Sequence, residues 1–177
     1  MLKGIAEPVL VFSDKKDAPG LKKAGKYGIK TASLSAKGKN REEFDKEVIN
    51  LLSEYDFDYI ILAGYMRILS DIFVKKFSGK IINIHPADTK LHQGLHAYKW
   101  AFENKLPETK ITVHYVNEGV DTGKIIAQTT VDLRGANTPK EVEKRGLTTE
   151  HEFYSQTLKE LLGTRKKEQV NDINKLK

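Results

Sequence analysis

Two polar side chains close one of the most apolar stretches of the chain. Asn83 and His85 end the run Lys80–His85, and Pro86 follows directly. On a strand, residues two apart point to the same face, so the carboxamide and the imidazole would lie side by side. A carboxamide can hold an oxyanion while an imidazole gives or takes a proton, and together these suit acyl transfer. A strand end with a hydrogen-bonded structural histidine is the alternative that this pair leaves open.

Asp121 is a second candidate for chemistry. It lies in the short connection Glu118–Gly123. Aspartate and glycine are what a tight connection needs in any case, so the composition alone does not require a function. The functional alternative is a carboxylate that orients the imidazole or accepts a proton.

The segment Ala63–Leu69 is a third candidate, because a glycine turn follows an apolar run and leads into Met66, Ile68 and Leu69. Such a segment offers backbone groups and apolar walls to a flat heterocycle. It would equally serve as a strand-to-helix turn whose apolar residues belong to the core.

The remaining histidines do not form a metal site by their spacing. His92 and His96 are four residues apart, but Gly94–Leu95 between them favours a loop over a helix. His114 lies within an apolar strand, where a structural histidine is expected. We therefore assign no metal.

Short apolar runs bounded by polar or turn residues predict strands that are covered on both faces. The predicted strands are Pro8–Ser13, Ile29–Leu34, Asp58–Ala63, Lys80–His85, Lys110–Asn117 and Lys124–Val131.

Amphipathic segments between these strands predict helices. Asn40 and Glu43 match a capping box ahead of a helix to Leu52. Ser70 is expected to cap a shorter helix that ends before Gly79. The other predicted helices are Ala97–Asn104 and a helix that starts at Thr138–Pro139 and runs towards Leu162, with an interruption at Gly146 left open and a stop at Gly163.

Strands that alternate with helices up to His85 predict parallel βαβ units. The connection Glu118–Gly123 is too short for a helix, so the two strands around it should pair antiparallel. The expected fold class is α/β, with an open, Rossmann-like, mostly parallel sheet, an antiparallel C-terminal hairpin and helices on both faces. We expect one domain over residues 1–162 and a charged tail over residues 163–177.

The amino-acid composition excludes several classes of protein. The 177 residues are 39% hydrophobic and 31% charged, as in a globular protein, and no cysteine is present for disulfides or thiolate chemistry. The longest apolar run, Tyr59–Ala63, is too short to span a membrane, and the first residues lack the apolar stretch of a signal peptide, so we expect a cytoplasmic protein without a membrane partner.

The net charge of +6 comes mostly from lysines near the two ends of the chain. No arginine-rich stripe interleaved with aromatic residues accompanies it, so we expect no nucleic-acid partner. Small phosphorylated or carboxylated ligands are compatible with this charge.

In combination and in this order, the motifs resemble those of the phosphoribosylglycinamide formyltransferase family. The resemblance covers about residues 8–162, and the segments that carry it are Ala63–Leu69, Ile82–Pro86, Gly94–His96 and His114–Gly123. It implies a formyltransferase fold. It also implies transfer of a formyl group from 10-formyltetrahydrofolate, as cosubstrate and without a metal, to the amine of glycinamide ribonucleotide in purine biosynthesis.

The resemblance also implies roles for individual residues. Asn83, His85 and Asp121 match the family's catalytic residues, with the first two on the formyl oxygen and the carboxylate supporting the charged imidazole. The positions matching the folate site are Met66, Arg67, Ile68, Leu69, Asn117, Glu118, Gly119 and Val120. The positions matching the acceptor site are Pro86 and Glu150.

Three departures from the family pattern fall on the acceptor side. The family's leading strand and its G-x-G-S-N phosphate loop have no counterpart before the first predicted strand. The segment Ala87–Gln93 differs from the apolar loop usual after the family's histidine, and Leu147 replaces a residue that is often polar. An uncovered strand edge would favour a partner, and a homodimer stays open.

These departures leave alternatives open. One is a truncated or degenerate relative that binds folate without efficient transfer, and another is a formyltransferase with a different acceptor. Methionyl-tRNA formyltransferases and formyl-donor hydrolases share the core but carry further domains, so we expect neither activity here.

Overall fold

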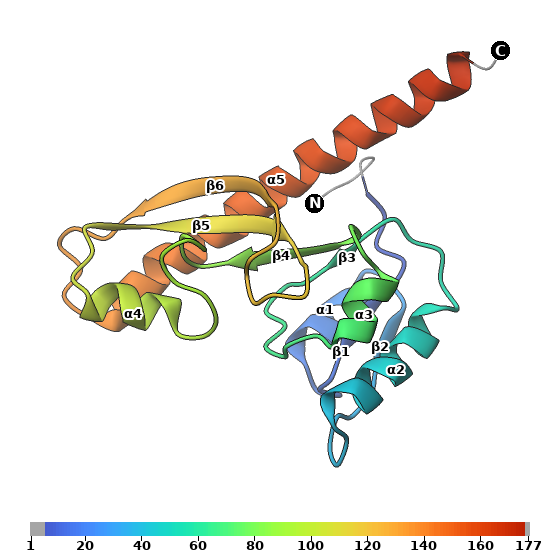
Figure 1. Cartoon of the computed structure of the whole chain (residues 1–177), viewed down its shortest axis with the longest axis horizontal. Coiled ribbons are helices and arrows are strands. Elements are labelled where there is room, and N and C mark those ends of the chain that lie inside the picture. Colours follow the sequence, from blue (N-terminus) through green and yellow to red (C-terminus); the bar gives the residue numbers. More distant parts are fainter. Residues whose placement is uncertain (1–5, 176–177) are drawn as a thin grey trace.

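The computed structural model describes residues 6–175, and it describes side chains up to Thr164. Eleven helices and strands follow one another within these residues and are drawn in Figure 1. The strands are β1 (Val11–Ser13), β2 (Thr31–Ser33), β3 (Ile60–Ile61), β4 (Ile81–His85), β5 (Glu108–Tyr115) and β6 (Ile125–Asp132). The helices are α1 (Pro19–Lys26), α2 (Arg41–Leu52), α3 (Asp71–Lys76), α4 (Ala97–Glu103) and α5 (Pro139–Lys175).

The strands form two groups. β1 and β2 pair in parallel, and β3, β4, β5 and β6 form a sheet in that order. β3 and β4 are parallel, whereas β4–β5 and β5–β6 are antiparallel. The predicted parallel units and the C-terminal hairpin are therefore confirmed, and the parallel strands are divided between two sheets.

Both faces of β4 are covered, which explains why its sequence is apolar throughout. Ile81 packs with α2 and α3, in a cluster that includes Phe44 and Phe73. Ile82 points the other way and packs against Tyr154 and other residues of α5. Adjacent residues of a strand face opposite sides, so this arrangement confirms helices on both faces of the sheet.

A local sequence signal accounts for the start of α2 but not for that of α3. Asn40 caps α2, because its side chain accepts a hydrogen bond from the Glu43 N–H at 3.0 Å while Glu43 accepts from the Asn40 N–H at 2.9 Å. This is the predicted capping box. Ser70 precedes α3 as expected, but its side chain forms no cap. Its N–H donates to the buried Asp45 carboxylate at 2.6 Å instead.

Helix α5 continues where the sequence predicts a stop. It passes through both Gly146 and Gly163, so the stop predicted at Gly163 is wrong. A glycine inside a helix costs about 1 kcal/mol, which good helix formers on both sides can offset. The lysines, glutamates and glutamine around Gly163 are such residues. α1 was not predicted at all, because it is short and contains two glycines.

No helix among residues 6–175 is both long and apolar enough to cross a membrane.

Candidate functional site

The candidate site lies on one face of β4 and β5. Asn83 and His85 point to the same face of β4, as their spacing predicts. The antiparallel register places His114 opposite Asn83 and Thr112 opposite His85. Cross-strand neighbours share a face, so β5 adds His114 to the predicted pair.

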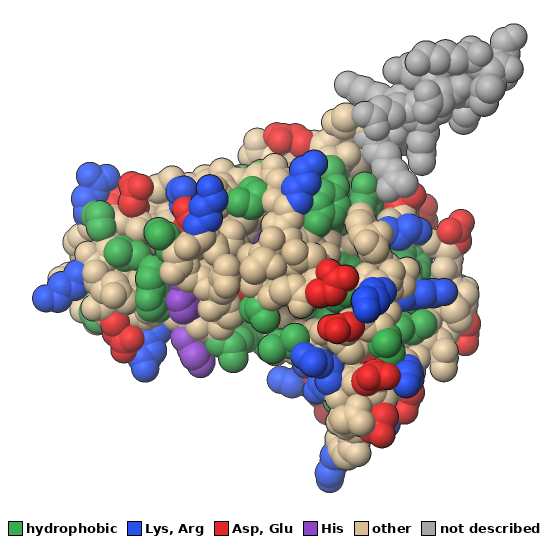
Figure 2. Space-filling view, viewed as in Figure 1, with side chains coloured by type: hydrophobic (Ala, Val, Ile, Leu, Met, Phe, Trp, Pro, Cys, Tyr) green, Lys and Arg blue, Asp and Glu red, His purple; other side chains and the backbone are tan. Residues whose placement is uncertain are grey.

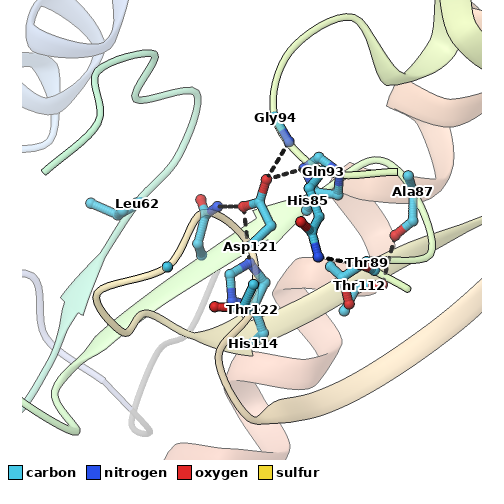
Figure 3. Close-up of polar contacts among 12 residues, drawn as sticks. Leu62, His85, Ala87, Thr89, Gln93, Gly94, Thr112, His114, Asp121 and Thr122 are labelled. Atoms are coloured by element: carbon cyan, nitrogen blue, oxygen red, sulfur yellow. Dashed lines mark hydrogen bonds and ion pairs between the residues drawn. The ribbon is translucent and has the colours of Figure 1, made fainter. Parts of the chain in front are cut away.

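Asp121 reaches this face from the β5–β6 connection (Figure 3). Its backbone is left-handed, with φ at 51°, and this allows the chain to turn back over the sheet. Gly123 is needed for the same turn, because a Cβ atom there would overlap the Tyr115 carbonyl oxygen. The connection therefore carries a carboxylate to the sheet through a turn that glycine makes feasible.

The Asp121 carboxylate gathers donors on both of its oxygens. His85 Nδ1 lies 3.2 Å from Oδ2, and the Gly94 N–H donates to the same oxygen at 2.9 Å. Asn83 Nδ2 and His114 Nε2 each lie 3.4 Å from Oδ1. These two contacts are longer, and that of His114 is an ion-pair distance rather than a well-aligned hydrogen bond. Asn83, His85 and Asp121 are thus together, as the sequence predicts.

Burial strengthens these interactions. The side chains of His85, His114 and Asp121 are 5%, 2% and 10% exposed. Burial alone would raise the pKa of Asp121, but the contacts from His114, Gly94 and His85 outweigh it and hold that pKa below its usual value. Asp121 is therefore ionised at neutral pH.

The pKa of His85 moves in the same direction for a different reason. Burial lowers the pKa of the imidazole below its usual 6.5, while the Asp121 charge and the contact to His92 oppose this. Nδ1 faces a carboxylate and Nε2 lies 3.1 Å from the His92 carbonyl oxygen, so both nitrogens face acceptors. The lowered pKa favours a singly protonated ring at neutral pH, and the ionised Asp121 carboxylate beside Nδ1 would stabilise a second proton when negative charge develops at Nε2.

His114 was expected to be purely structural, but it belongs to the site. Its Nδ1 contacts the Tyr115 carbonyl oxygen at 2.8 Å, which leaves Nε2 aimed at Asp121. The signal that could have found it is the strand register. Antiparallel pairing of the two predicted strands brings His114 next to Asn83.

The loop after His85 closes the site on one side. The Thr112 hydroxyl donates to the Ala87 carbonyl at 2.7 Å, and Lys110 forms an ion pair with Asp88, also at 2.7 Å. These contacts fix the start of the loop on β5, and Gly94 fixes its end on Asp121. The segment Ala87–Gln93 therefore forms an ordered wall beside His85.

The residues matched to the folate site lie on two segments, one after β3 and one between β5 and β6. Met66 and Ile68 are 73% and 59% exposed, whereas Arg67 turns inward and stacks over the Phe44 ring at 4.6 Å. Leu69 is half-buried against the core. From the β5–β6 connection, Val120 is 43% exposed.

Exposed apolar side chains also extend along the loop after His85. Leu91 and Leu95 are 68% and 57% exposed. We use the name apolar rim for these two side chains together with Met66, Ile68 and Val120, which all lie on the segments that follow β3 and β4 or join β5 to β6. Asn117, Glu118 and Gly119 are exposed, and the Asn117 side chain accepts from the Gly119 N–H and the Thr122 hydroxyl, which shapes the turn.

The two residues matched to the acceptor site lie apart in the chain. Pro86 follows β4 directly and is half-buried. Glu150 lies on α5, where its carboxylate accepts a hydrogen bond from the Tyr98 hydroxyl. Within the described residues no group of three or more histidine, aspartate or glutamate side chains could hold a metal ion.

The comparison with known proteins concerns the chain as a whole rather than this group of side chains. A family model described as formyl transferase matches residues 2–158. The chain belongs to this family. Sequence and structure comparisons agree with it and confirm the resemblance and the α/β fold that the motifs predict.

Two curated relatives and one solved structure give the extent of the similarity. Phosphoribosylglycinamide formyltransferase of Escherichia coli (strain K12) is 39% identical over 145 residues, which cover 81% of this chain and 68% of that protein. The enzyme of the same name from Bacillus subtilis (strain 168) is 36% identical over 159 residues, which cover 89% and 82%. The crystal structure of phosphoribosylglycinamide formyltransferase from Bacillus halodurans superposes with a TM-score of 0.84 at 34% identity, over 89% of this chain and 81% of that one.

Proposed function

We propose that this formyl transferase moves the formyl group of 10-formyltetrahydrofolate to the amine of glycinamide ribonucleotide, a step of purine biosynthesis. The observation that carries the proposal is the contact of Asp121 with His85 and Asn83 on one strand face. The identity of the acceptor is proposed from the names of the relatives, which are phosphoribosylglycinamide formyltransferases.

The chemistry follows from these side chains. The acceptor amine attacks the formyl carbon, a C–N bond forms, and negative charge develops on the formyl oxygen. The Asn83 amide and a protonated His85 donate to this oxygen, and one such donor contributes about a hundred- to a thousandfold to the rate. The bond from the formyl carbon to the folate nitrogen then breaks, and the proton lost by the amine ends on that nitrogen.

Asp121 stabilises the charged form of His85 during this step. Its ionised carboxylate lies 3.2 Å from Nδ1, so Nε2 is the nitrogen directed to the oxyanion. In the present structure Nε2 contacts the His92 carbonyl at 3.1 Å. When the formyl group binds, Nε2 therefore leaves the His92 carbonyl oxygen and donates to the formyl oxygen instead. The loop that carries His92 has to move for this exchange.

The apolar rim supports the formyl donor. Its five side chains are 43–73% exposed. Packing against a pterin ring would remove their apolar surface from water, which favours binding. Of the residues matched to the folate site, we propose that Met66, Ile68 and Val120 make side-chain contacts. Arg67 and Leu69 would shape the segment from within.

The protein surface fits small-molecule substrates. The face shown in Figure 2 mixes cationic and anionic side chains rather than gathering one sign. A phosphorylated ribonucleotide and a folate are the partners we propose, with no nucleic acid, no membrane and no metal, in the cytoplasm. The domain division at residue 162 and a homodimer stay predictions.

The deciding experiment incubates the protein with 10-formyltetrahydrofolate and glycinamide ribonucleotide and detects the formylated product by mass spectrometry. The His85→Ala variant, run in parallel, controls for a contaminating transferase. Product from the wild type and about a hundredfold less from the variant would support the proposal. Tight folate binding without product would favour the degenerate relative instead, and transfer only to another amine would favour a different acceptor.

A further inference from the structure

Tyr98 makes a contact that neither the catalytic residues nor the apolar rim accounts for. It lies in the first turn of α4, and its hydroxyl donates a hydrogen bond to Glu150 Oε1 on α5. The two residues are 52 positions apart, and both side chains are half-buried. α4 and α5 are thus joined by a bond to a charged group, the stronger kind of hydrogen bond.

Gly146 makes room for this contact. It is buried in α5, one helical turn before Glu150, and a Cβ atom at this position would overlap the ring and hydroxyl of Tyr98. A glycine inside a helix costs roughly 0.5–1 kcal/mol relative to alanine. The space that it leaves is filled by the Tyr98 ring, so the sequence and the contact fit each other.

The charges around Tyr98 keep its hydroxyl protonated. Burial raises the pKa of Tyr98 far above its usual value, and the hydrogen bond and charge of Glu150, with a further contribution from Glu143, raise it more. The phenol is therefore a donor and Glu150 is the acceptor. Within the described residues, Glu150 Oε2 has no hydrogen bond, and it is free to accept one from a ligand hydroxyl.

The contact is also connected to the catalytic centre through the backbone. Gly94, four residues before Tyr98, donates to Asp121 at 2.9 Å. Between them His96, with φ at 65°, sets the turn into α4. The Tyr98–Glu150 pair therefore lies a short turn away from the centre. Buried packing of Ala101 and Val142 in one cluster also holds α4 on α5 without this hydrogen bond.

We propose that Tyr98 is a positioning residue of the acceptor site, which holds Glu150 so that Oε2 accepts a hydroxyl group of the formyl acceptor. The ligand class is an amine that carries a sugar hydroxyl. This inference rests on the proposed function and on the match of Glu150 to the family's acceptor site, and it adds Tyr98 and Gly146 as the residues that orient Glu150.

The first test compares Tyr98→Phe with the wild type by steady-state kinetics. Loss of the bond to Glu150 should raise KM for glycinamide ribonucleotide about tenfold, because a hydrogen bond to a charged group is lost. kcat and KM for 10-formyltetrahydrofolate should stay within about twofold. An unchanged acceptor KM, or an equal loss in kcat and in both KM values, would overturn the proposal.

A double-variant cycle shows whether Tyr98 acts through Glu150. Glu150→Gln alone should raise the acceptor KM, and adding Tyr98→Phe to it should raise that KM no further. A purely structural role of Tyr98 would give independent effects that multiply. Multiplying effects would therefore contradict the proposal.

Gly146 allows a second test that leaves the hydroxyl in place. Gly146→Ala should displace the Tyr98 ring and raise the acceptor KM about tenfold, as Tyr98→Phe does. In a Tyr98→Ala background the same substitution should change KM less than twofold, because the ring it would strike is gone.

Gly163→Ala is the matched control for the helix. Gly163 lies in the same helix with open space around its Cβ position. This substitution should leave both KM values unchanged. A KM rise equal to that of Gly146→Ala would show that any alanine in α5 has the effect, and would overturn the assignment.

Failure of the inference and of the proposed function can be told apart. Formyl transfer by the wild type with an unchanged Tyr98→Phe variant refutes only the inference. If the wild type transfers nothing, calorimetric titration with glycinamide ribonucleotide replaces the kinetics. Binding about tenfold weaker in Tyr98→Phe than in the wild type then supports the inference, whereas equal binding, or no binding by the wild type, overturns it.

Discussion

The proposed catalytic centre and the apolar rim are built in opposite ways. His85, His114 and Asp121 are at most 10% exposed and are linked to one another by ion-pair contacts. Met66, Ile68, Leu91, Leu95 and Val120 are 43–73% exposed and are positioned by their backbone segments. The centre is thus arranged before substrate arrives, whereas the rim is available to be covered by it.

This difference predicts where substitutions act. A substitution in the centre alters charges whose positions are already fixed, so it lowers the rate of the chemical step, kcat. A substitution in the rim removes surface that is buried only on binding. It therefore weakens the affinity for the formyl donor and leaves the stability of the fold unchanged. The predictions below test this division, from the largest expected effect to the smallest.

Asp121→Asn should have the largest effect. The amide would turn one acceptor atom into a donor that faces the N–H donors of His85 or Gly94, and the charge supporting the imidazolium would be lost. We expect kcat to fall by about a thousandfold or more, measured with both substrates saturating.

Asp132→Asn is the matched control, because Asp132 ends β6 at the exposed end of the same hairpin and pairs with Arg134. It should leave kcat unchanged. Retention of more than a tenth of the wild-type kcat by Asp121→Asn would show that the buried carboxylate is not part of the centre.

Met66→Ala should raise KM for the formyl donor about tenfold. Full burial of such a side chain on binding contributes about 1.5–3 kcal/mol, and a rim residue realises part of this. kcat and the melting temperature should not change, because the side chain is 73% exposed.

Tyr27→Ala controls for loss of exposed apolar surface in general. Tyr27 is 61% exposed at the C-terminal end of α1, an element that contributes no residue to the rim. If Met66→Ala lowered kcat or the melting temperature instead of raising the donor KM, the division between centre and rim would not hold.

The pH dependence of stability should report on His85. Its folded-state pKa lies below the usual 6.5 because of burial. In the range below 6.5 the unfolded chain therefore binds more protons at this site than the folded one. Stability attributable to His85 is thus present above pH 6.5 and is lost as the pH falls below it, at no more than about 1.4 kcal/mol per pH unit.

Chemical denaturation at pH 7.5 and 5.5 measures this loss, and His85→Gln should show a smaller loss than the wild type. Asp121, His92 and His114 face His85 and remain in both proteins. The Asp121 contribution, from a lowered carboxylate pKa, is lost only at lower pH. Equal losses in the two proteins would mean that burial does not depress the pKa of His85.

Tyr154→Phe should have the smallest effect and act on stability alone. The Tyr154 hydroxyl, on α5, donates to the carbonyl oxygens of Leu62 at 2.9 Å and Ile82 at 3.2 Å. Its loss should lower the free energy of unfolding by about 1 kcal/mol, measured by urea denaturation. Ser155→Ala, one residue along at an exposed position, is the control, and an equal loss in both variants would contradict this role.

Much of the site could be predicted because it depends on local patterns. The period of two along a strand places Asn83 and His85 on one face, and this holds wherever the strand lies. The capping box at Asn40 and the short Glu118–Gly123 connection are equally local, and both form as expected. The combination of motifs indicated the family, and the comparisons confirm it.

Other features depend on which segments pair or pack, and the sequence did not reveal them. His114 enters the site only through its register opposite Asn83, so its strand pattern alone indicated a structural residue. The division of the strands into two sheets and the passage of α5 through Gly163 likewise depend on packing and on residues outside each local pattern.

By itself, the sequence determined the chemical groups and their positions along each element: carboxamide and imidazole on one strand face, and carboxylate in a turn. Only the tertiary structure decided that Asp121 contacts both and that Tyr98 reaches Glu150 across 52 residues. The physical reason is that hydrogen bonding and side-chain alternation act over a few residues, whereas these contacts require packing of elements that are distant in the chain.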